Sequence, residues 1–333
     1  MRISPFILLI PVALVSNPQL RAQNSPAPPG RLVDIGGQRI HVNCTGRGTP
    51  TVLLENGTGD FSMVWALVQP TVSRLTRVCS YDRGGSAWSE MGQRPRTFAQ
   101  LSLELHTALD RLHEKPPYVL VGQSYGGVLV RGFAAAYSKD VAGMVLVDAV
   151  HEDQHIVYGG APHLIRAEAR GRPYPAPHIA LDTAWTRMYR DSIAASAEPL
   201  EAPLDRLPPE ARRLWQWAAA LPSSRHAPGA ELDWSPEEFA RFHQERLTDR
   251  ATLGNLLLIV LARTSGEFDN GLAISADSLE RERRALMADL AALSHRGEVR
   301  YAPHSGHNIH LEDPDFVVTA IRDVVGKTRA GPL

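Results

Sequence analysis

The stretch that most constrains the fold is YVLVGQSYGG, residues 118–127, in which an apolar run leads directly into a serine flanked by glycines. Residues 118–121 fit a short buried strand, and residues 125–137 fit a helix. A strand that ends in Gly-x-Ser-x-Gly and begins a helix is typical of a nucleophile elbow, which holds the serine in a sharp turn with its Oγ above the sheet. Gly122 and Gly126 would let the neighbouring backbones pass close to Ser124. The alternative is a glycine-rich turn with a purely structural role.

The rest of the chain alternates short apolar runs with segments of helical periodicity. A Gly36-Gly37 turn joins residues 31–35 and 38–43 in a predicted hairpin. Further strands are expected at residues 51–54, 77–81, 144–147, 256–261 and 299–302, and further helices at residues 61–75, 97–113, 210–220 and 277–293 and from Asp313 onward. This alternation predicts an α/β fold with a mostly parallel sheet and helices on both faces.

Residues 150–250 interrupt this pattern. Prolines cluster there, four of the six tryptophans lie there, and the segments between the prolines have helical periodicity. We interpret residues 150–250 as a helical cap, or lid, inserted into an α/β core made of residues 31–149 and 251–333. The tryptophans fit either an apolar substrate pocket or the packing of the cap on the sheet.

The first residues have the pattern of an export signal. Arg2 precedes an apolar run at residues 6–15, which is too short to span a bilayer, and Ala22 is a small residue suited to cleavage. We expect residues 1–22 to be a signal peptide and residues 23–30 a flexible lead. The mature protein would then be secreted or periplasmic, with no stable membrane anchor after cleavage. An uncleaved anchor is the alternative.

The charge balance argues against two classes of binding partner, and the cysteine content allows one disulfide. The 35 Lys and Arg residues balance 36 Asp and Glu residues, so that neither nucleic acid nor an anionic membrane surface is expected as a partner. Cys44 and Cys79 lie in two predicted strands, and an exported protein with an even number of cysteines can form a disulfide. Two buried free thiols are the alternative.

Three further motifs accompany the serine turn: ENGTG at residues 55–59, YDRG at residues 81–84 and SGH at residues 305–307. With them, nearly the whole chain after the lead resembles the α/β-hydrolase superfamily, and within it the esterase-like members with a lid. The chain departs from the family at Asn56 and Gln123, where the family often has histidine. We expect these two changes to alter hydrogen bonding around the site rather than to abolish its chemistry.

The resemblance implies a catalytic triad in the chain order serine, acid, histidine. Ser124 is the expected nucleophile, and His307, in the turn after the last strand, is the expected base. For the acid the resemblance offers two places. One is the loop that holds Glu267 and Asp269, which begins with five residues that carry no carboxylate. The other is the end of an earlier strand, where Asp148 directly follows, as in haloalkane dehalogenases and pancreatic-type lipases. We favour Asp148 and keep Asp269 and Glu267 as alternatives.

The resemblance also implies two backbone donors for an oxyanion, the N–H groups of Tyr125 and Thr58, and it implies no metal or organic cofactor. We therefore expect an exported serine hydrolase that cleaves small-molecule carboxylic esters through an acyl-enzyme. A peptidase, a lactonase or a carbon–carbon bond hydrolase of the same fold is an alternative. A binding module without catalysis is another, although the presence of both Ser124 and His307 argues against it.

Overall fold

The computed structural model describes residues 25–158, 161–179, 183–265 and 276–330, so the predicted signal peptide lies outside the described residues. Within the described residues the main sheet has eight strands in the order β1-β2-β4-β3-β5-β6-β9-β10. The β1–β2 and β2–β4 pairs are antiparallel, and the pairs from β4 to β10 are parallel. The strands are β1 (Arg31–Asp34), β2 (Arg39–Thr45), β3 (Thr51–Glu55), β4 (Val78–Tyr81), β5 (Tyr118–Gln123), β6 (Val141–Val147), β9 (Leu257–Arg263) and β10 (Gly297–Ala302).

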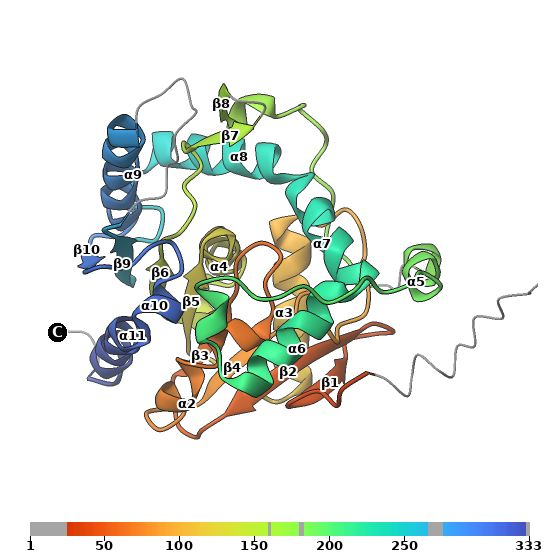
Figure 1. Cartoon of the computed structure of the whole chain (residues 1–333). Helices are drawn as coiled ribbons and strands as arrows, with labels where there is room; N and C mark the ends of the chain where they lie inside the picture. Colours follow the sequence, from red (N-terminus) through yellow and green to blue (C-terminus); the bar gives the residue numbers. More distant parts are fainter. Residues whose placement is uncertain (1–24, 159–160, 180–182, 266–275, 331–333) are drawn as a thin grey trace, which may run out of the picture.

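Helices cover both faces of this sheet (Figure 1). One face packs against α3 (Phe98–Arg111), α4 (Tyr125–Ala136) and α9 (Ala276–Ala291), and the other against η1 (Ser62–Trp65), α2 (Gln69–Val72), α10 (Ile309–Glu312) and α11 (Pro314–Arg329). Successive side chains of a strand point to opposite faces, so Leu120 of β5 joins one core and its neighbours Val119 and Val121 join the other. The predicted α/β fold, with a mostly parallel sheet between two layers of helices, is confirmed.

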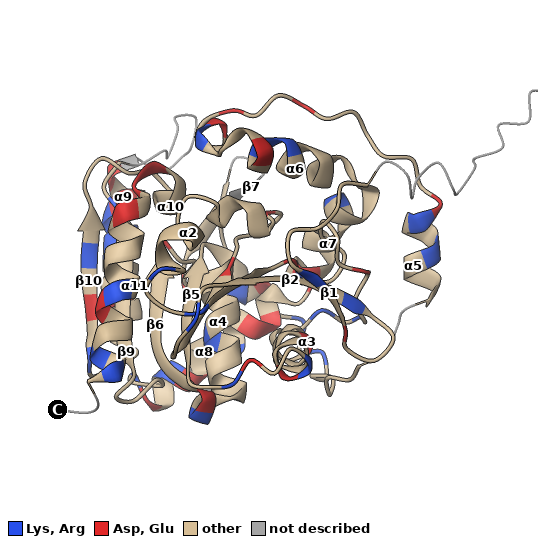
Figure 2. Ribbon diagram, turned by 90° about the horizontal axis from the view of Figure 1, so that it is seen from below, with Lys and Arg blue, Asp and Glu red and all other residues tan. Residues whose placement is uncertain are grey.

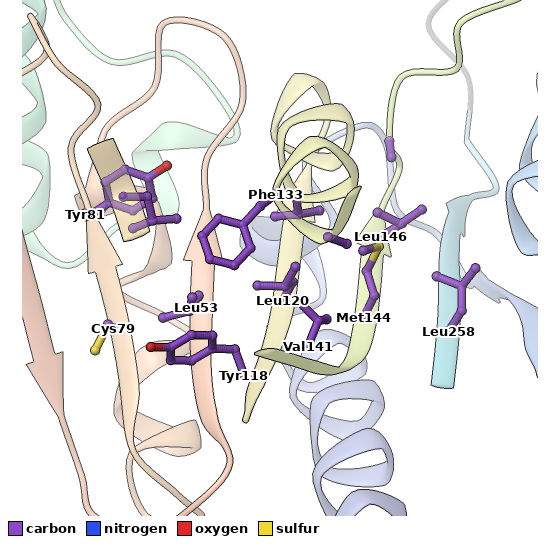
Figure 3. Packing of buried hydrophobic residues seen from close by; sticks show 14 of the residues in the cluster. Leu53, Cys79, Tyr81, Tyr118, Leu120, Phe133, Val141, Met144, Leu146 and Leu258 are labelled. Carbon is purple, nitrogen blue, oxygen red and sulfur yellow. The ribbon is translucent and has the colours of Figure 1, made fainter. Parts of the chain in front are cut away.

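The first of these cores is continuous across the middle strands (Figure 3). Leu120 of β5, Met144 of β6 and Leu258 of β9 are at most 1 % exposed, and Phe133 of α4 is buried with them. Burying each of these side chains contributes about 1.5–3 kcal/mol to folding. The central strands are apolar on both faces because helices exclude water from both, which explains why they appear in the sequence as continuous apolar runs.

Most of the elements between β6 and β9 are helices. It contains η3 (Ile165–Glu168), α5 (Thr183–Arg190), η4 (Leu204–Arg206), α6 (Pro209–Ala220), α7 (Pro222–Leu232) and α8 (Ser235–Thr248). It also contains a hairpin that the sequence analysis did not predict, formed by β7 (His155–Tyr158) and β8 (Ala161–Leu164). We keep the name cap segment for residues 150–250.

Two of the tryptophans in the cap segment pack it onto the core. The Trp215 ring lies 5.6 Å from that of Phe61, and the Trp217 ring lies 4.9 Å from that of Trp88. Both belong to an apolar cluster that also contains residues of η1 and α6. Of the two roles that the sequence allowed for these tryptophans, packing on the core is the one that these contacts support.

The structure differs from the sequence-based expectations at one place in the N-terminal half of the chain. The single helix expected over residues 61–75 is broken into η1 and α2, because Pro70 lies in the first turn of α2 and suits a helix start rather than a helix interior. The predicted lead contacts the core at two residues, since Trp88 Nε1 donates to the Pro26 carbonyl at 2.8 Å and His41 Nε2 contacts the Pro29 carbonyl.

Charged residues of both signs are interspersed along the chain, and α9 carries Arg and Glu side by side (Figure 2). This distribution agrees with the balanced composition, while α5 carries Arg187 and Arg190 and no acidic residue. Among the helices that the structure describes, none is both long and apolar enough to cross a membrane.

Cys44 of β2 and Cys79 of β4 lie directly opposite each other in the antiparallel pair, with their Cα atoms 4.0 Å apart, and a disulfide joins them. The disulfide closes a loop with a sequence separation of 35 residues. It therefore fastens the antiparallel end of the sheet to the parallel part, since β4 pairs with β2 on one side and with β3 on the other.

We predict that this disulfide contributes about 2–4 kcal/mol to the free energy of unfolding, because it restricts the unfolded chain. The measurement is guanidinium denaturation of the wild type with and without dithiothreitol, beside the double variant Cys44→Ser/Cys79→Ser as control. Reductant should lower the wild-type midpoint to that of the double variant and leave the double variant unchanged. Equal wild-type midpoints in the two conditions would contradict the prediction.

Candidate active site

Ser124 stands in a strained turn between β5 and α4. Its backbone angles are φ 53° and ψ −123°, a conformation that costs a residue other than glycine about 1–3 kcal/mol. Neighbouring segments hold it there. The Ser124 N–H donates to the Val147 carbonyl at 3.1 Å, and the Ser124 carbonyl accepts from the N–H groups of Gly127 and Val150 at 3.0 and 3.1 Å. The end of β6 and the start of α4 therefore fix the turn from both sides.

The two glycines around Ser124 are required by close backbone approaches. A Cβ on Gly122 would lie 2.5 Å from the Gly126 carbonyl oxygen, and a Cβ on Gly126 would lie 2.6 Å from the Glu55 carbonyl oxygen. Both contacts are with backbone atoms, which cannot rotate away as a side chain can. The strand before the serine and the helix after it therefore pack at a distance that only glycine permits, as the sequence pattern predicts.

His307, in the turn after β10, contacts the carboxylate of Asp148. Its Nδ1 lies 2.8 Å from Asp148 Oδ2, and Asp148 is buried at the end of β6. An imidazole that donates from Nδ1 to a carboxylate presents Nε2 as an acceptor, and the Gln123 side-chain amide lies 3.4 Å from Nε2. Among the described residues no hydrogen bond joins Ser124 Oγ to His307 Nε2. The structure thus pairs the predicted base with the favoured acid and brings both to the strand ends beside the serine.

The other histidines of this segment have different surroundings. His304 is exposed and has a positive φ of 67°. His310 is fully buried against Trp65, with their ring centroids 4.9 Å apart, and burial lowers its pKa to about 3. The alternative acids Glu267 and Asp269 lie outside the described residues.

The carboxylate of Asp148 has further partners that the sequence did not suggest. Arg283 of α9 donates from Nη1 to Asp148 Oδ1 at 3.0 Å, and the Arg263 N–H donates to the same oxygen at 3.3 Å. The Arg263 guanidinium also lies 3.8 Å from Oδ2. These donors fix the carboxylate so that Oδ2 faces His307. No motif could have revealed the contact of Arg283 with Asp148, because the two residues are 135 positions apart in the chain and the sequence of α9 contains no distinctive motif.

The predicted oxyanion donors belong to two backbone segments, the start of α4 and the turn of residues 57–60. Tyr125 is the first residue of α4, where an N–H group has no partner within the helix. Thr58 belongs to the turn of residues 57–60, which is closed by Asp60 N–H to the Gly57 carbonyl at 3.4 Å. A Cβ on Gly57 would lie 3.2 Å from Ser124 Cβ, so this turn passes directly beside the serine. The two backbone segments predicted to supply donors are therefore both next to Ser124.

Asp60, in the same turn, is a site residue that the sequence analysis missed. Its carboxylate accepts from Trp215 Nε1 of α6 at 3.3 Å, and burial raises its pKa above the ordinary value. Its position directly after the ENGTG motif could have drawn attention to it. It links the turn beside the serine to the cap segment.

The described residues contain one group of metal-ligating side chains close enough to share an ion, which consists of Cys44, Cys79 and Glu114. Both of these sulfurs are in the disulfide, and a metal ligand is a thiolate. This group is therefore not a metal site.

Comparison with known proteins identifies the family. The profile of the alpha/beta hydrolase family matches residues 52–320, so the chain belongs to this family. The chain is 25 % identical over 326 residues to the "Probable transporter efuK" of Hormonema carpetanum, covering 90 % of this chain but only 43 % of that protein. It is 26 % identical over 274 residues to the uncharacterized protein YqjL of Bacillus subtilis, covering 82 % of this chain and 83 % of that one.

Solved structures share the fold at low sequence identity. A meta-cleavage product hydrolase from Pseudomonas fluorescens (CumD) is similar with a TM-score of 0.60 and 18 % identity, over 89 % of this chain and 97 % of that one. A thermophilic esterase from Thermogutta terrifontis is similar with a TM-score of 0.57 and 21 % identity, over 87 % of this chain and 94 % of that one. These similarities show that the chain shares the fold of these proteins.

We predict that the free energy of unfolding of Ser124→Gly is about 1 kcal/mol higher than that of Ser124→Ala. Glycine relieves the strain of the turn, whereas alanine removes the hydroxyl and keeps the strain; the gain is reduced by the greater freedom of glycine in the unfolded chain. Urea denaturation of both variants measures the difference.

Ser102, inside α3, supplies the control. There glycine should be less stable than alanine by about 0.5–1 kcal/mol, the opposite sign. A glycine variant at position 124 that is no more stable than the alanine variant would show that the turn stores no strain.

Proposed function

We propose that this protein is a serine hydrolase that cleaves carboxylic esters through an acyl-enzyme intermediate. The observation that carries the proposal is the His307–Asp148 pair, 2.8 Å apart, at the strand ends beside a serine held in a strained turn. A serine hydroxyl is a weak nucleophile without a base, and the proposal assigns that role to His307, whose Nε2 lies 3.4 Å from the side-chain amide of the neighbouring residue Gln123. A serine at this position is also the wrong residue for the aspartate chemistry of epoxide hydrolases and dehalogenases of the same fold.

In the first step Ser124 Oγ attacks the ester carbonyl while His307 Nε2 takes its proton. This requires Nε2 to exchange the Gln123 amide at 3.4 Å for Ser124 Oγ, and catalytic hydrogen bonds often tighten in this way when substrate binds. The tetrahedral oxyanion accepts from the N–H groups of Tyr125 and Thr58. Collapse breaks the bond to the alcohol, which leaves with the proton held by His307. Water then attacks the acyl-enzyme with His307 again as base, and Ser124 is regenerated.

Asp148 holds His307 in the tautomer that this mechanism needs. Its Oδ2 accepts from Nδ1, so Nε2 is unprotonated and faces the serine side of the site. It also stabilises the imidazolium that forms during attack. The donors from Arg283 and Arg263 to Oδ1 keep the carboxylate from turning away.

Export is the second part of the proposal. The N-terminal pattern of residues 1–22 and the Cys44–Cys79 disulfide both support a secreted or periplasmic location, since disulfides persist in oxidising compartments.

We predict a burst of nitrophenolate near one equivalent of enzyme when the mature chain is mixed with p-nitrophenyl butyrate in a stopped-flow instrument. The burst reports formation of the acyl-enzyme before slower deacylation. It should be absent in Ser124→Ala. Turnover without a burst that is still lost in Ser124→Ala would mean that acylation limits the rate. Absence of any hydrolysis of short esters by the wild type would contradict the esterase assignment and favour a peptidase, a lactonase or a carbon–carbon bond hydrolase.

We predict that Asp148→Asn lowers kcat by orders of magnitude, up to about 10⁴-fold, because the amide favours the wrong imidazole tautomer. Steady-state hydrolysis of the same ester measures the loss. Asp110→Asn, on the exposed surface of α3, is the matched control and should keep wild-type kcat. If Asp148→Asn is near wild type while Asp269→Asn is inactive, the acid is Asp269 and the present assignment is wrong.

A further inference from the structure

A buried arginine is hydrogen-bonded to the segment that carries the proposed donor Thr58. Arg83, after β4, is 3 % exposed, and it donates from Nη1 to the Asn56 carbonyl at 2.8 Å and from Nη2 to the Gly57 carbonyl at 2.9 Å. The Gly57 carbonyl and the Thr58 N–H belong to one planar trans peptide unit and point in opposite directions. Fixing the Gly57 oxygen therefore fixes the direction of the Thr58 N–H.

Two buried carboxylates from distant parts of the chain hold Arg83 in this position. Its Nη1 lies 2.6 Å from Glu55 of β3, and its Nε lies 2.9 and 3.0 Å from the two carboxylate oxygens of Glu231. Glu55 also accepts from the hydroxyl of Tyr81. The guanidinium thus serves four partners at once, two carboxylates and two backbone carbonyls, which the planar fork of arginine allows and a lysine ammonium does not. Glu231, only 1 % exposed, belongs to α7 of the cap segment.

The same part of the cap segment contacts the residue that carries the second proposed donor. The Tyr125 hydroxyl lies 2.8 Å from Ser235 Oγ and donates to the Glu231 carbonyl at 3.3 Å. Glu231 therefore contacts the arginine that holds the Gly57 carbonyl, through its carboxylate, and the side chain of Tyr125, through its backbone carbonyl. Another contact of α7 lies nearby, where Ser224 Oγ accepts from the Ala87 N–H at 2.9 Å.

We propose that Glu231 and Arg83 are positioning residues that make α7 of the cap segment part of the oxyanion site, and this inference rests on the proposed function. Glu231 aligns Arg83, Arg83 aligns the Gly57–Thr58 peptide, and the Thr58 N–H receives the developing charge. The cap segment then acts on the chemical step itself in addition to covering the substrate. Loss of the Glu231 contact weakens binding of the tetrahedral state and leaves binding of the uncharged ester nearly unchanged.

The test compares Glu231→Gln with Glu152→Gln. Glu152 is a matched control because, like Glu231, it is a buried carboxylate of the cap segment that pairs with a buried arginine of the core, Arg131 of α4 at 2.7 Å. Its other partner, Arg246 at 2.6 Å, lies within the cap segment, and its carboxylate has no contact with residues 56–59 among the described residues. For each variant the measurements are kcat and KM for p-nitrophenyl butyrate, the inhibition constant of an alkyl boronic acid, and thermal unfolding. The boronic acid forms a tetrahedral adduct with a serine nucleophile, so its affinity reports the oxyanion site directly.

We expect Glu231→Gln to lower kcat and boronic acid affinity each by roughly 10²-fold, the effect of losing one oxyanion donor, with KM within about threefold of wild type. Glu152→Gln should lower the unfolding temperature and keep both kcat and boronic acid affinity within about threefold. Wild-type kinetics for Glu231→Gln, or equal losses in both variants, would overturn the inference. A wild type that neither hydrolyses the ester nor binds the boronic acid would instead refute the proposed function.

A second variant keeps the inference testable if Glu231→Gln does not fold. Arg83→Lys keeps a positive charge beside Glu231 and removes the planar fork that donates to the Asn56 and Gly57 carbonyls. It should lower kcat and boronic acid affinity by roughly 10-fold each at nearly constant KM. Unchanged values for both would overturn the inference.

Discussion

The close approach of the β5–α4 turn to the backbone of β3 is the constraint on which the rest of the site depends. Gly126 packs so tightly on the Glu55 carbonyl that no side chain fits, and this contact forces Ser124 into a backbone conformation that non-glycine residues avoid. The burial of the central strands on both faces of the sheet stabilises the fold and offsets the cost of that strain. A loosely packed sheet would let the turn relax and the hydroxyl move away from the strand ends.

The site gathers at the carboxyl ends of the parallel strands because that is where successive strands of such a sheet end next to one another. Ser124 follows β5, Asp148 follows β6, and the segment with His307 follows β10. These positions lie far apart in the chain and meet only when the sheet forms. Arginines complete the arrangement from outside the sheet: Arg283 steadies Asp148 from α9, and Arg83 steadies the segment with Thr58. Each is buried or nearly so, which makes the geometry stiff at the cost of burying charge.

The sequence predicted the elements whose signal is local. Apolar runs and the Gly36-Gly37 turn located the strands of the main sheet, and the glycines around Ser124 located the elbow, because these patterns follow from contacts within a few residues. The hairpin of β7 and β8 was missed, since short strands such as HIVY lie among prolines and charged residues that favour loops. The contacts of Glu231 and Arg283 could not be predicted, because their partners lie more than a hundred residues away and any of many arginines and glutamates in this chain would have fitted as well.

Direct mapping of the acylated residue tests the central claim, that Ser124 carries the acyl group. The mature chain would be mixed with p-nitrophenyl butyrate, quenched in acid during turnover, digested and analysed by mass spectrometry. The proposed mechanism predicts a butyryl group on the peptide that contains Ser124, at an amount close to the burst, and none in Ser124→Ala. A butyryl group on a different residue, or sustained turnover with no acylated peptide in a wild type that shows a burst, would contradict it.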